Sequence, residues 1–227
     1  MARGDVLVVE DTPEYTQVVT AALSNVGFTV RTVGTVADAL QALDVVAADL
    51  VVLDLGLPDG DGFDLCRVVR ERTNAYILIL TVRAEEVDLL LGFRLGADDY
   101  MTKPFSTREL VARVEAMMRR PRGDLTGAIV RRFGDVTIDL RSRECHVDGS
   151  PVELTRIEFD LLATLSDDPR AVFTRRQLLD RVWGDGWVGD DHVVDVHIAN
   201  LRKKIDHSGD QSAIRTVRGV GYGFTLP

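Results

Sequence analysis

Residues 50–62 read LVVLDLGLPDGDG, and this stretch decides the fold of the first half of the chain. Its four leading residues are apolar and are followed closely by Gly and Pro, as is typical of a fully buried parallel strand that ends in a turn. Asp54 then stands at the carboxyl end of the strand, where open α/β sheets bind ligands. Taken alone, Asp54 is equally well interpreted as an acid that caps the following turn.

Strand-like and helix-like segments alternate on both sides of this stretch. The pattern predicts strands at 6–9, 29–32, 50–53, 76–80 and 99–101, and helices at about 13–25, 35–46, 63–72 and 85–95, with a last helix after 104. Five strands that alternate with five helices predict an α/β fold, a doubly wound five-stranded parallel sheet.

Polar residues follow four of these strands: Glu10, Asp11, Asp54, Thr81 and Lys103. The carboxyl ends of parallel strands meet at one edge of the sheet, so these side chains are expected to converge. Crowded carboxylates repel one another unless a cation joins them, and oxygen ligands suit Mg²⁺. A hydroxyl and an ammonium group in the same pocket suit a phosphoryl group. The site is predicted to let one carboxylate attack phosphorus.

With these residues in view, the chain from 5 to 120 resembles the receiver domain of two-component response regulators. The motifs that carry the resemblance are Glu10-Asp11, Asp54 with Leu57-Pro58 and Gly62, Thr81, and Gly96–Tyr100 running into Lys103-Pro104-Phe105. A dehalogenase-type phosphatase is disfavoured, because it needs a second Asp at position 56, which is Gly.

The resemblance implies a role for each matching residue. Asp54 is then the phosphoacceptor from a sensor histidine kinase, and Thr81 and Lys103 contact the phosphoryl group. Mg²⁺ is bound by Asp11, Asp54 and the Gly56 carbonyl, with Glu10 assisting. Tyr100 turns inward on activation, and the Lys103-Pro104 bond is expected to be cis.

The resemblance also implies an activated homodimer formed through the fourth helix, fifth strand and fifth helix. The matching ion-pair positions are Asp98, Asp99, Glu109, Arg113 and Arg120. Two residues depart from the family pattern. Val82 replaces a small residue, which predicts an altered lifetime of the phosphoryl group. Leu89 replaces a basic residue that pairs with Glu109 across the dimer, which leaves the strength of the dimer open.

A shift to Pro, Gly and charge at 121–128 predicts a linker between a first domain at 1–120 and a second at 129–227. Strand signals lie at 136–138 and 145–147, and capping boxes at Thr155 and Thr174 open two helices. A third helix at about 193–205 has an apolar side and a polar, solvated side. Residues 216–224 have the alternating pattern of two strands around a turn that contains glycine, as in a hairpin. This order predicts an α+β winged helix-turn-helix, with the last helix in the major groove.

Residues 193–204 and 216–224 resemble the effector domain of the OmpR/PhoB family, which implies binding to double-stranded promoter DNA. The candidate contacts are His192, His197, Asn200, Arg202, Lys203, Lys204 and, in the hairpin, Arg218. Departures at His192, Asn200 and Gly223 leave the base preference open. The turn at 183–189 is where the family contacts RNA polymerase; aromatic residues that pin this loop to the core are an equal alternative.

Composition and the cysteine positions give expectations for the partners, the location and the disulfide bonds of the protein. The net charge of −9 argues against nucleic acid, but residues 196–227 hold five basic and two acidic residues. No apolar stretch approaches the length of a membrane span, and no signal-peptide pattern precedes residue 6, so a cytoplasmic protein without a membrane partner is expected. Cys66 and Cys145 fall in different predicted domains, which favours free thiols.

Together these patterns predict a non-enzymatic transcription regulator that is phosphorylated on Asp54, dimerises through its receiver and binds direct repeats in promoters. Two alternatives stay open at this point. One is a constitutive DNA-binding protein whose receiver only dimerises, and the other, less favoured, is a small-molecule phosphatase or phosphotransferase.

Overall fold

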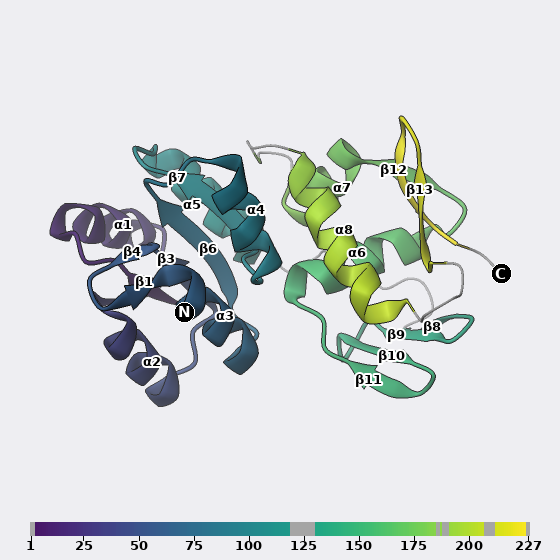
Figure 1. Cartoon of the computed structure of the whole chain (residues 1–227), viewed down its shortest axis with the longest axis horizontal. Coiled ribbons are helices and arrows are strands. Elements are labelled where there is room, and N and C mark those ends of the chain that lie inside the picture. The colour runs from purple at the N-terminus through teal and green to yellow at the C-terminus, as the bar shows by residue number, and fades with distance from the viewer. Residues whose placement is uncertain (1–2, 119–129, 185–186, 188–190, 207–211, 226–227) are drawn as a thin grey trace. The chain divides into compact units, whose positions relative to one another are not determined.

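The computed structural model of the 227-residue chain describes residues 3–118, 130–184, 187, 191–206 and 212–225. The chain forms two compact units, Met1–Arg119 and Arg120–Pro227 (Figure 1). The predicted linker at 121–128 and the candidate residue Arg120 lie outside the described residues.

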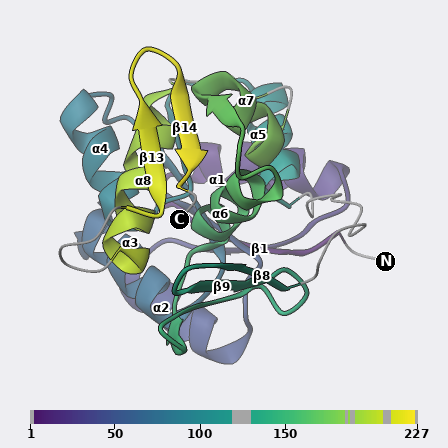
Figure 2. The same ribbon diagram turned by 90° about the vertical axis from the view of Figure 1, so that its right-hand side faces the viewer.

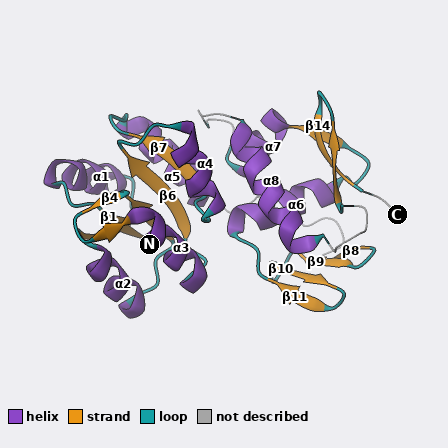
Figure 3. Cartoon of the chain, viewed as in Figure 1, coloured by secondary structure: helices purple, strands orange, loops and turns teal. Residues whose placement is uncertain are grey.

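The first unit is a parallel sheet in the order β2-β1-β3-β6-β7 with helices on both sides (Figure 3). Its strands are β1 (Asp5–Val9), β2 (Thr29–Val33), β3 (Leu50–Leu53), β6 (Tyr76–Thr81) and β7 (Asp99–Thr102). Its helices are α1 (Pro13–Asn25), α2 (Val36–Val45), α3 (Gly62–Arg72), α4 (Glu86–Arg94) and α5 (Thr107–Met118). A short hairpin, β4 (Gly56–Leu57) and β5 (Gly60–Asp61), follows β3. The predicted doubly wound five-stranded sheet is confirmed.

The strand order explains where the first unit gathers its polar residues. Strand β1 lies between β2 and β3, so the winding of the chain reverses there. All four residues of β3 are buried, as are the six of β6, because helices cover both faces of the sheet. Side chains that follow β1 and β3 are therefore brought to the same edge.

The second unit combines two small antiparallel sheets with three helices. One sheet has the order β11-β10-β9-β8 and the other β12-β14-β13. The strands are β8 (Val130–Phe133), β9 (Val136–Asp139), β10 (Glu144–Val147), β11 (Ser150–Val152), β12 (Val172–Thr174), β13 (Ile214–Val217) and β14 (Gly221–Phe224). The helices are α6 (Arg156–Asp167), α7 (Arg175–Val182) and α8 (His192–Ile205). Figure 2 shows β13 and β14 side by side, and they pair as an antiparallel hairpin. Helices α6 to α8 followed by this hairpin confirm the predicted winged helix-turn-helix.

Three strands of the second unit were not predicted. β8 carries Arg131 and Arg132, so it lacks the apolar run that marks a buried strand. β11 and β12 have three residues each, too few for an alternating pattern to stand out.

Among the described residues, no helix has both the length and the apolar character that crossing a membrane requires.

Helix α6 begins at a reciprocal capping box. Thr155 Oγ1 accepts from the Glu158 backbone N–H at 3.2 Å, and Glu158 Oε2 accepts from the Thr155 backbone N–H at 2.8 Å. A second box joins Thr174 and Gln177 at the start of α7. Both predicted boxes are confirmed, and each satisfies backbone donors that a helix start leaves unpaired.

Replacing Thr155 with Ala is expected to lower the free energy of unfolding of the second unit by about 1 kcal/mol, because the Glu158 N–H loses its acceptor. Both tryptophans of the chain lie in this unit, so urea denaturation followed by tryptophan fluorescence reports on it. Thr155→Ser keeps the hydroxyl and serves as the control. Equal stability of the Ala and Ser variants would contradict the assignment.

Candidate functional site

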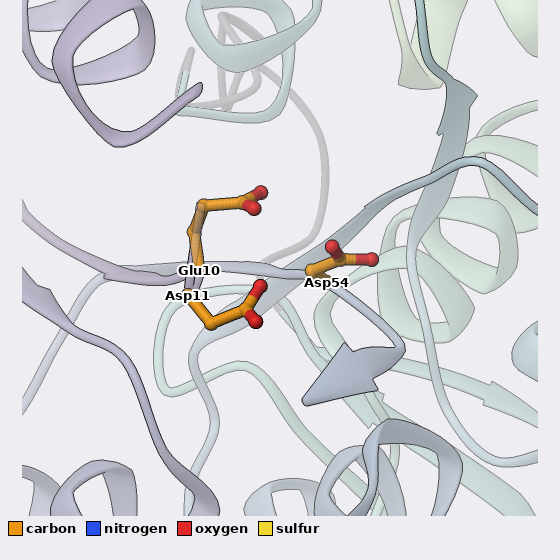
Figure 4. Close-up of side chains that lie close together, drawn as sticks. All are labelled: Glu10, Asp11 and Asp54. Atoms are coloured by element: carbon orange, nitrogen blue, oxygen red, sulfur yellow. The ribbon is translucent and has the colours of Figure 1, made fainter. Parts of the chain in front are cut away.

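Three carboxyl groups meet at the edge of the sheet where β1 and β3 end (Figure 4). One oxygen from each of Glu10, Asp11 and Asp54 lies within 4.8 Å of the others. Glu10 and Asp54 are buried, whereas Asp11 is exposed. The predicted convergence of these residues is found in the structure.

Lys103 enters the same pocket from the segment between β7 and α5. Its Nζ donates to Glu10 Oε2 at 2.6 Å and to Asp54 Oδ2 at 2.7 Å. The Lys103-Pro104 peptide bond is cis, as expected, and the Lys103 backbone N–H donates to the Thr81 carbonyl at 2.8 Å. This main-chain hydrogen bond to the end of β6 fixes the position of the Lys103 backbone. The Lys103 side chain is 2% exposed.

The charge balance of the pocket favours a further cation. Burial raises the pKa of Glu10, and the hydrogen bond from Lys103 opposes that rise. Three carboxyl groups lie around a single ammonium group, so acidic groups outnumber basic ones in the cluster. A buried cluster of unequal charge is costly unless another partner compensates it.

The donor set fits Mg²⁺. The available atoms are carboxylate oxygens, and the exposed Asp11 leaves a side open to the waters that Mg²⁺ retains. The Gly56 backbone N–H donates to Asp54 Oδ1 at 3.2 Å, which orients that carboxylate. Glu10, Asp11 and Asp54 are therefore the residues that can hold the ion, and a role for the Gly56 carbonyl stays a prediction.

Thr81 is the last residue of β6, and Tyr100 lies in the neighbouring strand β7. Thr81 is fully buried, and its Oγ1 accepts from the Arg83 backbone N–H at 3.4 Å. Tyr100 lies inward, and its hydroxyl donates to the Arg83 carbonyl at 2.9 Å. Burial raises the pKa of Tyr100 to about 12, so the hydroxyl stays protonated. Val82, which directly follows Thr81, is 68% exposed.

Two contacts in the first unit were not predicted. The Tyr15 ring lies 4.3 Å from Lys103 Nζ, measured to the ring centroid. Asp59, in the turn between β4 and β5, accepts from the backbone N–H groups of Val36 at 2.7 Å and Ala37 at 3.1 Å. These bonds lower the pKa of Asp59 and tie the β4–β5 hairpin to the start of α2. Neither contact has a local sequence signal, since both partners are distant in the chain.

The predicted dimer-face residues pair within one chain. Asp98 Oδ2 accepts from Arg70 Nη2 at 2.6 Å and from the Ile77 backbone N–H at 2.8 Å. Arg113 Nη1 donates to Asp99 Oδ1 at 2.8 Å, and its Nη2 donates to Glu109 Oε1 at 2.8 Å. Burial lowers the pKa of Arg113, but Asp99 and Glu109 outweigh it and hold that pKa above its usual value. Asp98 and Asp99 are buried.

The seven predicted DNA contacts differ in their exposure. His192, Lys203, Lys204 and Arg218 are exposed, whereas Asn200 and Arg202 are partly exposed. His197 lies in the core, with its ring 5.6 Å from that of Trp183.

Lys204 and Arg202 form hydrogen bonds with other elements of the second unit. Lys204 Nζ donates to Glu158 Oε2 at 2.7 Å. Arg202 donates to the Ile214 carbonyl at 2.6 Å and to Thr216 Oγ1 at 2.8 Å. These bonds fix α8 to the start of α6 and to β13.

Asp195 on α8 links that helix to α7 and to the hairpin, a role that was not predicted. Its Oδ1 accepts from Arg175 Nε at 2.7 Å and from the Tyr222 hydroxyl at 2.6 Å, and its Oδ2 lies 3.2 Å from His192 Nδ1. Burial raises the pKa of Asp195, but these hydrogen bonds hold it below its usual value. The Tyr222 ring lies between Arg175 and Arg202, 5.5 and 5.6 Å from their guanidinium carbons. The helix and the hairpin are thus held in one frame.

The predicted turn at 183–189 is described only in part. Trp183 and Trp187 are buried, and their ring centroids lie 6.3 Å apart. This placement agrees with the alternative in which aromatic residues pin the loop to the core. Residues 185–186 and 188–189 lie outside the described part of the chain.

Comparison with known proteins agrees with both units. Residues 6–115 match the family model described as response regulator receiver domain, and residues 149–224 match transcriptional regulatory protein, C terminal. The DNA-binding response regulator MtrA of Mycolicibacterium smegmatis is 42% identical over 97% of this chain and 96% of its own length. The transcriptional regulatory protein TrcR of Mycobacterium tuberculosis is 43% identical over 98% of this chain and 87% of its own.

Solved structures give the same match. A RitR mutant superposes with a TM-score of 0.79 at 30% identity, over 98% of this chain and 99% of its own. The response regulator DrrB of Thermotoga maritima, described as an OmpR/PhoB homolog, gives 0.53 at 33% identity over 99% of this chain and 100% of its own.

Removing the charge of Lys103 is expected to tighten Mg²⁺ binding. The Lys103→Met variant keeps the length of the side chain but no longer competes for Glu10 and Asp54, so the dissociation constant for Mg²⁺ should fall by at least about threefold. Calorimetric titration of the whole chain at fixed ionic strength measures it. Lys203→Met removes an exposed lysine of the second unit and should change nothing; weaker binding by Lys103→Met would contradict the charge argument.

Adjacent lysines on α8 are expected to respond differently to Ala. Lys204→Ala should lower the stability of the second unit by about 1–2 kcal/mol, because Glu158 is buried and loses a charged donor. Lys203→Ala should leave stability unchanged but reduce the salt dependence of binding to a mixed-sequence duplex by about one released ion. Urea denaturation and salt titrations test the pair, and equal effects of both variants would refute the different roles assigned to the two lysines.

Proposed function

Because the chain belongs to the OmpR/PhoB family of DNA-binding response regulators, we propose that Asp54 is its phosphoacceptor and that a sensor histidine kinase is the donor. The observation that carries this proposal is the position of Asp54, whose carboxylate lies at the end of β3 against Lys103 and beside Glu10. The chain is a transcription regulator of a two-component system, and we propose that it acts as a switch and not as an enzyme.

The phosphoryl group passes from the kinase histidine to Asp54. An Asp54 oxygen attacks phosphorus, the bond between phosphorus and the histidine nitrogen breaks, and an acyl phosphate forms. Asp11, Asp54 and the Gly56 carbonyl, with help from Glu10, would hold Mg²⁺, which would compensate negative charge during the transfer. Lys103 already contacts Asp54 and needs only a small shift to reach a phosphoryl oxygen. Thr81 supplies its hydroxyl from the end of β6.

Phosphorylation shifts the population toward a receiver surface that dimerises. Engagement of Thr81 changes the segment that holds Arg83, whose carbonyl accepts the hydrogen bond from Tyr100. The charged residues on the proposed dimer face are Asp98, Asp99, Glu109, Arg113 and Arg120. Asp99, Glu109 and Arg113 already pair within the chain, so dimerisation exchanges existing pairs for pairs between subunits.

The second unit binds promoter DNA as a pair on direct repeats. His192, Asn200 and Lys203 face outward on α8 and are the proposed contacts in the major groove, and Arg218 reaches a minor groove from the hairpin. His197, Arg202 and Lys204 hold α8 in place. The proposed place of action is the cytoplasm, and RNA polymerase is the proposed partner of the turn at 183–189.

Neither alternative is favoured by the comparisons, which match both units to regulators of this type. A constitutive DNA-binding protein would not need a buried lysine held between two carboxylates at the end of a strand. A small-molecule phosphotransferase would need a substrate pocket beyond these residues.

Asp54→Asn is expected to abolish labelling of the whole chain by radiolabelled acetyl phosphate in the presence of Mg²⁺. Dimerisation, followed by sedimentation, and tighter binding to a promoter fragment selected with the phosphorylated protein should be lost together with the label. Asp44→Asn, at an exposed acid on α2 outside the carboxylate cluster, is the labelling control. Equal DNA affinity with and without the label would favour the constitutive regulator, and multiple turnover of an added phosphate ester would favour the enzyme.

A further inference from the structure

The ring of Tyr15 contacts the Lys103 ammonium group, which also binds Glu10 and Asp54. The ring centroid lies 4.3 Å from Nζ, and the same nitrogen lies 2.6 Å from Glu10 Oε2 and 2.7 Å from Asp54 Oδ2. Two carboxylates and one aromatic ring thus surround a lysine whose side chain is 2% exposed.

Tyr15 reaches this position because of where α1 begins. The helix starts at Pro13, shortly after Glu10 and Asp11, so its first turn lies over the carboxylate cluster. The Tyr15 ring also packs against Phe105, with ring centroids 6.0 Å apart and planes inclined by 31°. Phe105 follows Lys103 by two residues. The ring therefore contacts both the lysine and the segment that carries it.

An aromatic ring acts on a buried ammonium group in a specific way. The face of the ring carries negative electrostatic potential and attracts the cation, most strongly where water is excluded. It adds no formal charge to the pocket, so it does not compete with Mg²⁺ or with a phosphoryl group. A Leu at this position would fill space but leave one side of the ammonium without a favourable partner.

We propose that Tyr15 is a positioning residue for phosphoryl transfer, whose ring holds the Lys103 ammonium group beside Asp54. The inference rests on the proposed phosphorylation of Asp54. Tyr15 acts through Lys103 and does not touch the reacting atoms. When the phosphoryl group arrives, the ammonium is already oriented and little reorganisation is needed to compensate the added charge.

The test uses the whole chain and radiolabelled acetyl phosphate with saturating Mg²⁺. Tyr15→Leu is expected to lower the initial rate of labelling by about three- to tenfold, the range that loss of a cation–π contact implies. Tyr15→Phe keeps the ring face and should restore the rate to within about twofold of the unaltered protein. Phe28→Leu is the matched control, because it removes a ring from the opposite edge of the sheet, where Phe28 lies 5.8 Å from the Arg3 guanidinium carbon.

Mg²⁺ affinity of the unphosphorylated protein separates positioning from simple structural damage. Tyr15→Leu should bind Mg²⁺ as tightly as the unaltered chain or more tightly, since a less firmly held Lys103 competes less for Glu10 and Asp54. A parallel loss of Mg²⁺ affinity and labelling in Tyr15→Leu would overturn the inference in favour of a packing role. If Tyr15→Leu unfolds, Tyr15→Met replaces it with the same expectations.

The remaining outcomes are also decisive. Labelling of Tyr15→Leu at the rate of the unaltered protein would overturn the inference and leave the proposed function of Asp54 intact. Slow labelling of Tyr15→Phe would show that the hydroxyl, and not the ring face, matters. No labelling of the unaltered protein would overturn the proposed function and this inference together.

Discussion

The buried lysine shared by Glu10 and Asp54 is the interaction on which the first unit depends. Two carboxylates 2.6 and 2.7 Å from one ammonium group are tolerable in a buried site because the ammonium offsets part of their negative charge. That requirement fixes the ends of β1 and β3 and the segment after β7 relative to one another. It also makes the pocket responsive, because any cation or anion that enters must change the partners of Lys103.

Much of this arrangement follows from local sequence patterns. The apolar run Leu50–Leu53 and the similar run in β6 identify buried parallel strands, and a parallel sheet brings their carboxyl ends together. The capping boxes at Thr155 and Thr174 identify helix starts, because each pairs two residues three positions apart. In such cases the residues that stabilise the strand or the helix start are neighbours in the chain, so the element can be predicted from the local sequence.

Other features depend on contacts between distant segments and could not be predicted. Tyr15 reads as an ordinary residue of a first helical turn until Lys103 is placed beside it. His197 belongs to the polar side of α8 by spacing, yet the buried arc is wide enough to include it. The charged strand β8 is likewise recognised only after β9 pairs with it. Periodicity shows which residues share a face, but the neighbour that covers the face decides whether they are buried.

The frame around α8 has a consequence for how such regulators diverge. Arg202, Lys204 and Asp195 direct their polar groups to other parts of the protein, so changes there threaten folding. Lys203 and, in the hairpin, Arg218 are exposed and are proposed DNA contacts. Mutations at these exposed positions can therefore alter operator choice while the scaffold persists. After gene duplication, two copies can acquire separate sets of target genes through a few substitutions, without passing through an unfolded intermediate in their evolution.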